Sequence, residues 1–239
     1  MRKSIFIRLI IILAIYIGLR YFGGETGRQI LYPVILLVTY LHELGHAVGA
    51  WITGGSVENI IVNKDGSGLT RSVGGSHAII LMGGYIGSAI FGNILFLIGS
   101  RFNILVKPIL LILAIAMMGT GLLIYSSVFT TGFLVLFSLF LILVIWKTNW
   151  GREILMFLGL ASILYIIQDF NVGPSSDLAK YAEIMKVLPA DVWMYIWLFV
   201  ALFLFFINLR FIFKEDRRSP ETESIIPKNE DFLDLDAKV

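Results

Sequence analysis

The chain has no cysteine, few charged residues and only three histidines. Without cysteine it can form neither disulfides nor cysteine-ligated zinc sites. Charged residues make up 15% of the 239 residues and hydrophobic residues 57%, whereas a soluble domain is about one-quarter charged. This composition predicts a polytopic membrane protein. The net charge of +2 points to no particular partner, and no basic face suggests a nucleic acid.

Seven apolar runs follow one another along the chain. Each is a candidate membrane span, and they cover residues 4–22, 30–53, 77–99, 107–125, 128–146, 153–168 and 192–213. The sixth run is only just long enough, because a spanning helix takes about 20 residues. Seven crossings from a cytoplasmic N-terminus would also place Lys214 outside, against the positive-inside tendency. We therefore expect an all-α polytopic protein of the cell membrane, with six to seven transmembrane helices.

The second run contains the sequence His42-Glu43-Leu44-Gly45-His46. Residues four apart share one face of a helix, so His42 and His46 can direct two imidazoles at one metal ion. Glu43 lies beside them and can act as a base on water, as in the His-Glu-x-x-His motif of zinc metalloproteases. The alternative is that the three side chains only form hydrogen bonds inside a helical bundle. Ionisable groups at membrane depth are costly and usually functional, so we expect one Zn²⁺ per chain.

The third zinc ligand is open among four residues: His77, Asp65, Asp169 and Asp177. A turn already explains Asp65, and nothing near His77 directs it inward. Counting spans places Asp169 on the same side of the membrane as the motif, at the end of an apolar run. Asp177 reaches that side too, but it follows two serines in a pattern typical of a helix N-cap. We select Asp169, with Asp177 as the alternative.

Residues 54–76 break the apolar pattern. Asp65-Gly66 is a strong hairpin signal, so we expect a short β-hairpin directly after the metal-bearing helix. An extended peptide can add to the edge of such a hairpin. Val57 and Ile61 are therefore candidate substrate-binding residues. A plain connecting hairpin is an equally good interpretation.

Small residues line one face of the third run: Gly83, Gly84 and Gly87. Such faces let membrane helices approach closely, and we expect this one to pack against the metal-bearing helix. Asn93 follows on the same helix. It is a candidate contact to the substrate backbone, and an interhelical hydrogen bond is the alternative.

At residues 42–46, 54–55, 65–70 and 84–88 the chain resembles the site-2 protease family, most closely its small B-like branch. The resemblance extends from about residue 30 to 200. It implies an intramembrane zinc protease with His42 and His46 as ligands and Glu43 as base. An aspartate from a later helix would be the third ligand. The family's Leu-Asp-Gly and Gly-Pro-x-x-Asn sequences and a PDZ-like segment are missing, and Asn93 is the nearest counterpart of the second.

We therefore expect a zinc-dependent intramembrane endopeptidase. It would cut membrane-spanning protein substrates in or near their transmembrane segments, within the bilayer, in regulated intramembrane proteolysis. A non-proteolytic scaffold and a divalent-metal transporter are the alternatives, and the intact Glu43 argues against both, since metal binding alone needs no base. Residues 1–213 would form the transmembrane metalloprotease domain, and residues 214–239 a disordered charged tail. The sequence indicates no oligomeric state.

Overall fold

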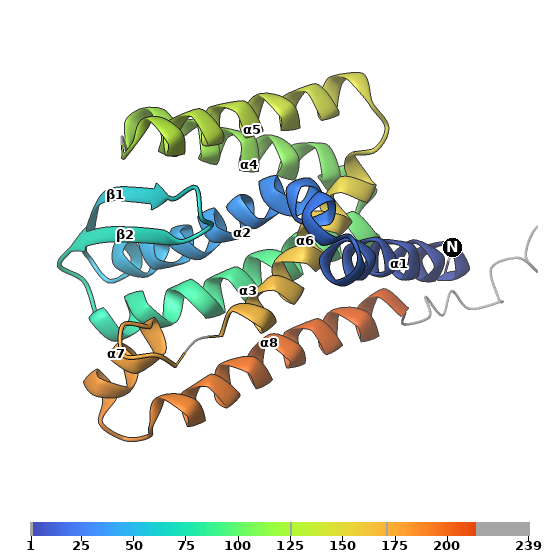
Figure 1. Ribbon diagram of the computed structural model, residues 1–239. Helices are drawn as coiled ribbons and strands as arrows, with labels where there is room; N and C mark the ends of the chain where they lie inside the picture. The colour runs from blue at the N-terminus through green and yellow to red at the C-terminus, as the bar shows by residue number, and fades with distance from the viewer. Residues whose placement is uncertain (1, 125, 171, 214–239) are drawn as a thin grey trace, which may run out of the picture.

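The described part of the chain is mostly helical, with one small sheet between the second and third of its long helices. The computed structural model describes residues 2–124, 126–170 and 172–213, so the predicted tail lies outside the described residues. In chain order the elements are α1 (Arg2–Ile17), a π-helical segment η1 (Gly18–Phe22), α2 (Gly24–Ile52), β1 (Ser56–Val62), β2 (Gly68–Val73), α3 (His77–Arg101), α4 (Asn103–Leu123), α5 (Val128–Lys147), α6 (Gly151–Asp169), α7 (Asp177–Met185) and α8 (Ala190–Phe213) (Figure 1). The predicted all-α polytopic fold is confirmed.

Within the described residues, six helical segments are long and apolar enough to cross a membrane: Ile5–Phe22, α2, α3, α4, α5 and α8. The predicted sixth run is not among them. It forms α6, whose apolar side chains Leu155 and Met156 are fully buried inside the protein. Glycines bring α6 and α3 together, because a Cβ on Gly159 would lie only 2.4 Å from the backbone nitrogen of Phe96. The short sixth run is therefore an interior helix of the bundle.

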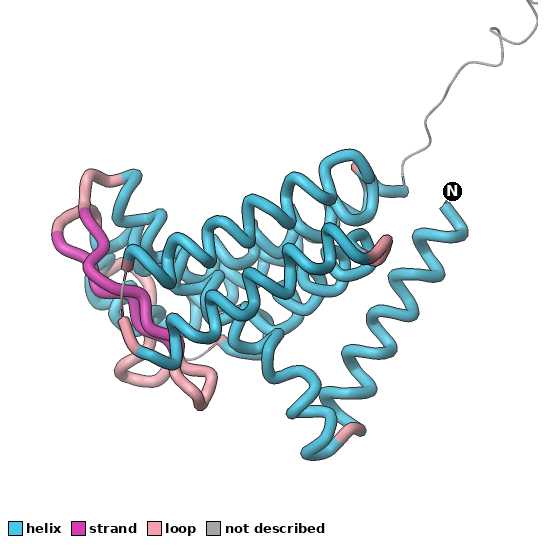
Figure 2. The backbone as a smooth tube through the Cα atoms, turned by 90° about the horizontal axis from the view of Figure 1, so that it is seen from above, coloured by secondary structure: helices cyan, strands magenta, loops and turns pink. Residues whose placement is uncertain are grey.

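Two ends of the molecule are distinct. The hairpin, α7 and the first turns of α3 and α8 gather at one end (Figure 1), and Figure 2 shows both strands of the hairpin at that end. The connection between α5 and α6 lies at the other end, together with the start of α1. The C-terminal half of α2, which carries the His-Glu-x-x-His motif, reaches the hairpin end.

The predicted hairpin is present as two antiparallel strands. Ile60 pairs with Thr70, Ile61 with Leu69 and Val62 with Gly68. Asp65 closes the turn, since its Oδ1 accepts hydrogen bonds from the Ser67 amide at 2.9 Å and the Ser67 hydroxyl at 2.7 Å. Gly66 has a φ of +89°, a conformation that side chains disfavour. The Asp-Gly pair therefore sets the turn, as the sequence indicated.

The outer edge of β1 is covered by the start of α5 and the loop before it. The Ile60 amide donates to Ser126 Oγ at 3.1 Å, and the Ser126 hydroxyl donates to the Ile60 carbonyl. Two residues further on, Thr130 bonds both the amide and the carbonyl of Val62, each at 3.1 Å. These side chains satisfy the edge groups of β1, so the uncovered edge of the hairpin belongs to β2.

Candidate metal and substrate site

The two motif histidines converge on an aspartate from a distant part of the chain. His42 Nε2 lies 3.1 Å from His46 Nε2, and each of the two nitrogens lies 3.2 Å from Asp177 Oδ2. All three ligand-type atoms lie within 4.8 Å of one another. Two imidazole nitrogens and one carboxylate oxygen are a donor set that suits a catalytic zinc ion.

A hydrogen bond determines which nitrogen of His46 is available to a metal. His46 Nδ1 lies 2.7 Å from the backbone carbonyl oxygen of Ile80. A carbonyl oxygen only accepts, so Nδ1 donates a hydrogen bond to it, and Nε2 is the nitrogen that faces Asp177. Metal-bound histidines in proteins are commonly held by such a bond through their second nitrogen. His42 Nδ1, in contrast, is buried with no hydrogen-bond partner in the described part of the chain.

Asp177 is positioned by the short helix α7. Ser176 is the N-cap of this helix, because its Oγ accepts a hydrogen bond from the Ala179 amide at 3.1 Å. Asp177 is the first residue of α7, and its side chain is directed at the histidines. Burial acts to raise the pKa of its carboxyl. The hydrogen bonds and charges of His42 and His46 outweigh burial and hold that pKa well below its usual range, in the ionised form a ligand needs.

Aromatic packing holds α7 in place. Leu178 is fully buried, and the ring of Tyr181 makes edge-on contacts with Trp193 and Trp197 of α8, with centroids 4.9 Å apart in both cases. The Trp197 ring also contacts Tyr85 of α3, whose ring meets His42 edge-on at 4.8 Å. One aromatic cluster therefore connects the helix that carries Asp177 to the imidazole of His42.

The preference for Asp169 rested on an argument that the structure overturns. Capping was taken to explain Asp177, but Ser176 makes the cap and leaves the Asp177 carboxylate to the histidines. Asp169 is the last residue of α6, and its side chain lies outside the described part. Neither His77 nor Asp65 belongs to the His42–His46–Asp177 group.

Glu43 is buried between the histidines and the hairpin, with 4% of its surface exposed. The Thr70 hydroxyl lies 2.7 Å from Glu43 Oε2 and 2.9 Å from the Glu43 backbone carbonyl. Gly68 packs on the other side of this carboxylate, since a Cβ there would lie 2.4 Å from Oε1. Sequence reasoning missed Gly68 and Thr70. The available signal was their spacing, because residues two positions apart on a strand face the same side.

The predicted small-residue face of α3 does pack against the metal-bearing helix. Gly83 and Gly45 meet so closely that a Cβ on Gly83 would lie 2.4 Å from the Gly45 carbonyl oxygen. A Cβ on Gly84 would lie 2.5 Å from His46 Nε2 and 2.6 Å from His42 Nε2. Gly87 contacts Gly45 in the same row, where its Cβ would lie 3.0 Å from the Gly45 Cα. The expectation for Gly83, Gly84 and Gly87 is confirmed.

These groups open into one cavity of about 640 Å³. His42, Glu43, His46 and Asp177 line it from α2 and α7, and the β2 residues Gly68, Leu69 and Thr70 line it from the hairpin. Lys180, one turn after Asp177, also borders it. The arrangement brings a carboxylate base, a metal-type donor set and the uncovered strand edge to the same space.

The three predicted substrate-binding residues lie outside this lining. Val57 and Ile61 are in β1, the strand whose outer edge faces α5. Asn93 is buried in α3, where Asn208 of α8 donates to its side-chain oxygen at 2.8 Å and to its backbone carbonyl at 2.9 Å. Asn93 therefore forms the interhelical bond that the sequence left open as its alternative role.

Comparison with known proteins gave one match. A family model described as Peptidase M50B-like matches residues 7–208. Comparison with curated proteins and with solved structures found no match. The matched stretch contains the motif, the hairpin, the α3 glycines and Asp177.

Proposed function

Because the chain belongs to the Peptidase M50B-like family, whose members are intramembrane metallopeptidases, we propose that it is a zinc-dependent intramembrane endopeptidase. It would cut membrane-spanning proteins in or near their transmembrane segments, as in regulated intramembrane proteolysis. The observation that carries this proposal is the convergence of His42, His46 and Asp177 beside the buried carboxylate of Glu43. We take residues 1–213 as the peptidase domain, which the matched stretch supports.

His42, His46 and Asp177 are the proposed zinc ligands. Three features support this: their nitrogen and oxygen donors, the lowered pKa of the Asp177 carboxyl, and the Ile80 bond that occupies His46 Nδ1 and leaves Nε2 to face Asp177. Three protein ligands leave a coordination position open, as catalytic zinc sites do. When bound, Zn²⁺ supplies Lewis-acid polarisation of the scissile carbonyl and acidifies the attacking water.

Glu43 is the proposed general base. Its carboxylate would take a proton from the attacking water and deliver it to the amine that leaves when the peptide bond breaks. Burial protects this carboxylate from bulk water, and the Thr70 hydrogen bond orients it. Metal storage or transport has no use for a base held in this way, which favours the peptidase over the transporter and the scaffold.

The uncovered edge of β2 is the proposed substrate-binding element, in place of Val57 and Ile61. In an antiparallel ladder, residue pairs alternate between bonding each other and turning their N–H and C=O groups away from the partner. The backbone N–H and C=O groups of Ile60 and Val62 point away from β2, towards Ser126 and Thr130. The same groups of their pair partners, Thr70 and Gly68, therefore point away from β1, at the uncovered edge of β2. A helical substrate must unwind to expose its scissile carbonyl, and pairing with these groups would hold the unwound segment as an added strand.

The experiment combines metal analysis with cleavage of single-span substrates by the purified protein in detergent. Wild type should hold about one zinc per chain. Glu43→Gln should keep that zinc and lose activity by a factor on the order of 10²–10⁴. Glu58→Gln, on the exposed face of β1, is the matched control and should cut normally. A Glu43→Gln protein that cuts as fast as wild type would overturn the proposal.

A further inference from the structure

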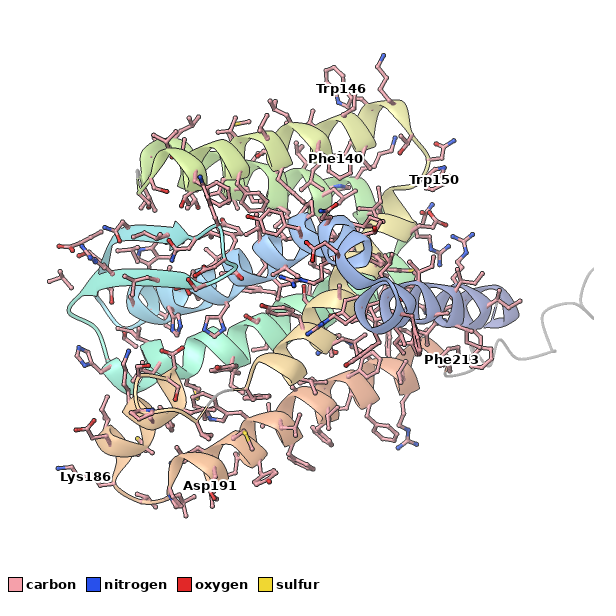
Figure 3. The ribbon with its side chains drawn as sticks, viewed as in Figure 1. Phe140, Trp146, Trp150, Lys186, Asp191 and Phe213 are labelled. Atoms are coloured by element: carbon pink, nitrogen blue, oxygen red, sulfur yellow. The ribbon has the colours of Figure 1, made fainter. Side chains whose placement is uncertain are left out.

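A second polar cavity lies at the end of the molecule opposite the histidines. It has a volume of about 440 Å³ and is formed where α4 begins, α5 ends and α6 begins. Figure 3 labels Trp146 and Trp150 at this end, and Lys186 and Asp191 at the hairpin end. The polar groups lining the cavity are Asn103, Lys107, Thr148, Asn149 and Arg152. None of the functions proposed above uses it.

The ionisable groups lining this cavity are both cations. Lys107 makes no ion pair with any residue that the structure describes. Arg152 is held in a fixed orientation, because its Nε donates to the Gly99 carbonyl at 2.8 Å and its Nη2 to the Ser100 carbonyl at 2.5 Å. Its Nη1 takes part in neither bond. Among the described residues no carboxylate lines the cavity, and the nearby Glu153 pairs with Arg8 instead. The charge of the described lining is therefore positive and favours the binding of an anion.

Two helix N-termini add to this positive charge. α4 and α6 both contribute their first turns to the lining. Their N-cap residues, Phe102 and Trp150, make no side-chain capping bond. Neither N-cap side chain therefore accepts a hydrogen bond from the first amides of its helix, and the positive end of each helix dipole favours a negative group.

The remaining wall and the surroundings are apolar. Val106, Leu110, Val144 and Ile145 line one side. Trp146 and Trp150 beside the cavity are 81% and 69% exposed, and tryptophans gather at the level of lipid headgroups. An inorganic anion would gain nothing from the apolar wall. An amphiphile could place its charged head against the cations of the cavity and its apolar chains against that wall.

We propose that this cavity binds the headgroup of an anionic phospholipid. The lipid phosphate would pair with Lys107 and the free nitrogen of Arg152, and the glycerol and upper chains would contact the apolar wall. Basic pockets between membrane helices bind anionic headgroups in this way. The site lies where α4 and α6 begin, at the opposite end of the bundle from the hairpin and α7, which border the peptidase cavity (Figure 1), so its occupancy is a separate property of the protein.

The test is native mass spectrometry of the full-length protein in detergent, with phosphatidylglycerol or phosphatidylcholine added. Wild type should retain phosphatidylglycerol preferentially. Lys107→Gln should weaken its retention about fivefold, and Lys107→Arg should restore it. Lys147→Gln is the matched control, because Lys147 is an exposed lysine at the same end of the bundle that does not line the cavity.

Three outcomes would overturn the proposal. Equal retention of the two lipids by wild type would remove the headgroup preference. Equal losses in Lys107→Gln and Lys147→Gln would indicate diffuse attraction to the basic surface. The unfolding temperature is also measured with inorganic phosphate alone. If phosphate raises it as much as phosphatidylglycerol does, the cavity is a free-anion site. The unfolding temperature of each lipid-free variant, compared with that of wild type, verifies that it is folded.

Discussion

The Thr70 hydroxyl lies 2.7 Å from Oε2 of Glu43, which joins the second strand of the hairpin to the carboxylate of the metal motif. Gly68, two residues earlier on the strand, leaves no space for a side chain against the other oxygen of that carboxylate. The strand that contacts the carboxylate of Glu43 is β2, which is also the strand with the uncovered edge. Substrate pairing and proton transfer would therefore occur along one structural element.

The first prediction concerns this hydrogen bond. Thr70→Val removes the hydroxyl and leaves a buried carboxylate with one fewer donor. Hydrogen bonds to charged groups contribute about 1.5–3 kcal/mol, so kcat should fall roughly tenfold to a hundredfold. Because the backbone edge is kept, KM should change little. Steady-state cleavage kinetics measure both constants.

Thr70→Ser keeps the hydroxyl and is the control for this prediction. It should recover most of the lost kcat. Equal activities of Thr70→Val and wild type would show that the hydrogen bond has no part in the reaction.

The second prediction concerns the contact between Gly84 and the histidines. Gly84→Ala would place a Cβ 2.5 Å from His46 Nε2, and either the imidazoles or α3 must move. Overpacking of this kind costs about 1–3 kcal/mol, so we expect a lower unfolding temperature and less bound zinc. Gly119→Ala in α4 is the control, since nothing lies within 4 Å of its Cβ position. A fully metallated and equally stable Gly84→Ala protein would contradict the prediction.

The third prediction identifies the third zinc ligand. Asp177→Ala should reduce zinc content from about one per chain towards zero, because two imidazoles remain where catalytic zinc sites use three protein ligands. Asp169→Ala, measured side by side, should keep its zinc. Elemental analysis of the two purified proteins decides between them. Zinc lost only in Asp169→Ala would restore the choice made from the sequence.

The part of the site that follows from local sequence was predictable. Spacing alone brings His42 and His46 to one helix face, Asp65-Gly66 marks the turn, and the glycine row of α3 marks a close helix contact. Each of these is a property of residues a few positions apart. For the same reason the second helix, the hairpin and their order along the chain agree with the structure.

The part that depends on distant contacts was not predictable. Asp177 and Asp169 both suit a ligand in sequence, and only the cap made by Ser176 and the packing of Tyr181 on α8 direct Asp177 to the histidines. The uncovered edge of the hairpin likewise depends on Ser126, 66 residues from Ile60, which covers β1. Neither relationship leaves a periodic signal in the chain.

The last prediction tests which strand binds the substrate. The chain has no cysteine, so single introduced cysteines report their neighbours without background. Leu69 and Ile61 are directly paired across the hairpin, Leu69 on β2 and Ile61 on β1. A substrate strand added to β2 lies about 4.8 Å from β2 and about 9.6 Å from β1. A disulfide requires the two Cα atoms to lie within about 7 Å.

With a substrate that carries one cysteine near its cleavage site, Leu69→Cys should therefore crosslink under mild oxidation and Ile61→Cys should not. The crosslinked product is quantified by non-reducing electrophoresis in the inactive Glu43→Gln background, so that the substrate stays intact. Crosslinking by Ile61→Cys alone would return the substrate to β1, as the sequence first indicated. Equal crosslinking of both would mean that the substrate lies across the face of the hairpin and forms no added strand.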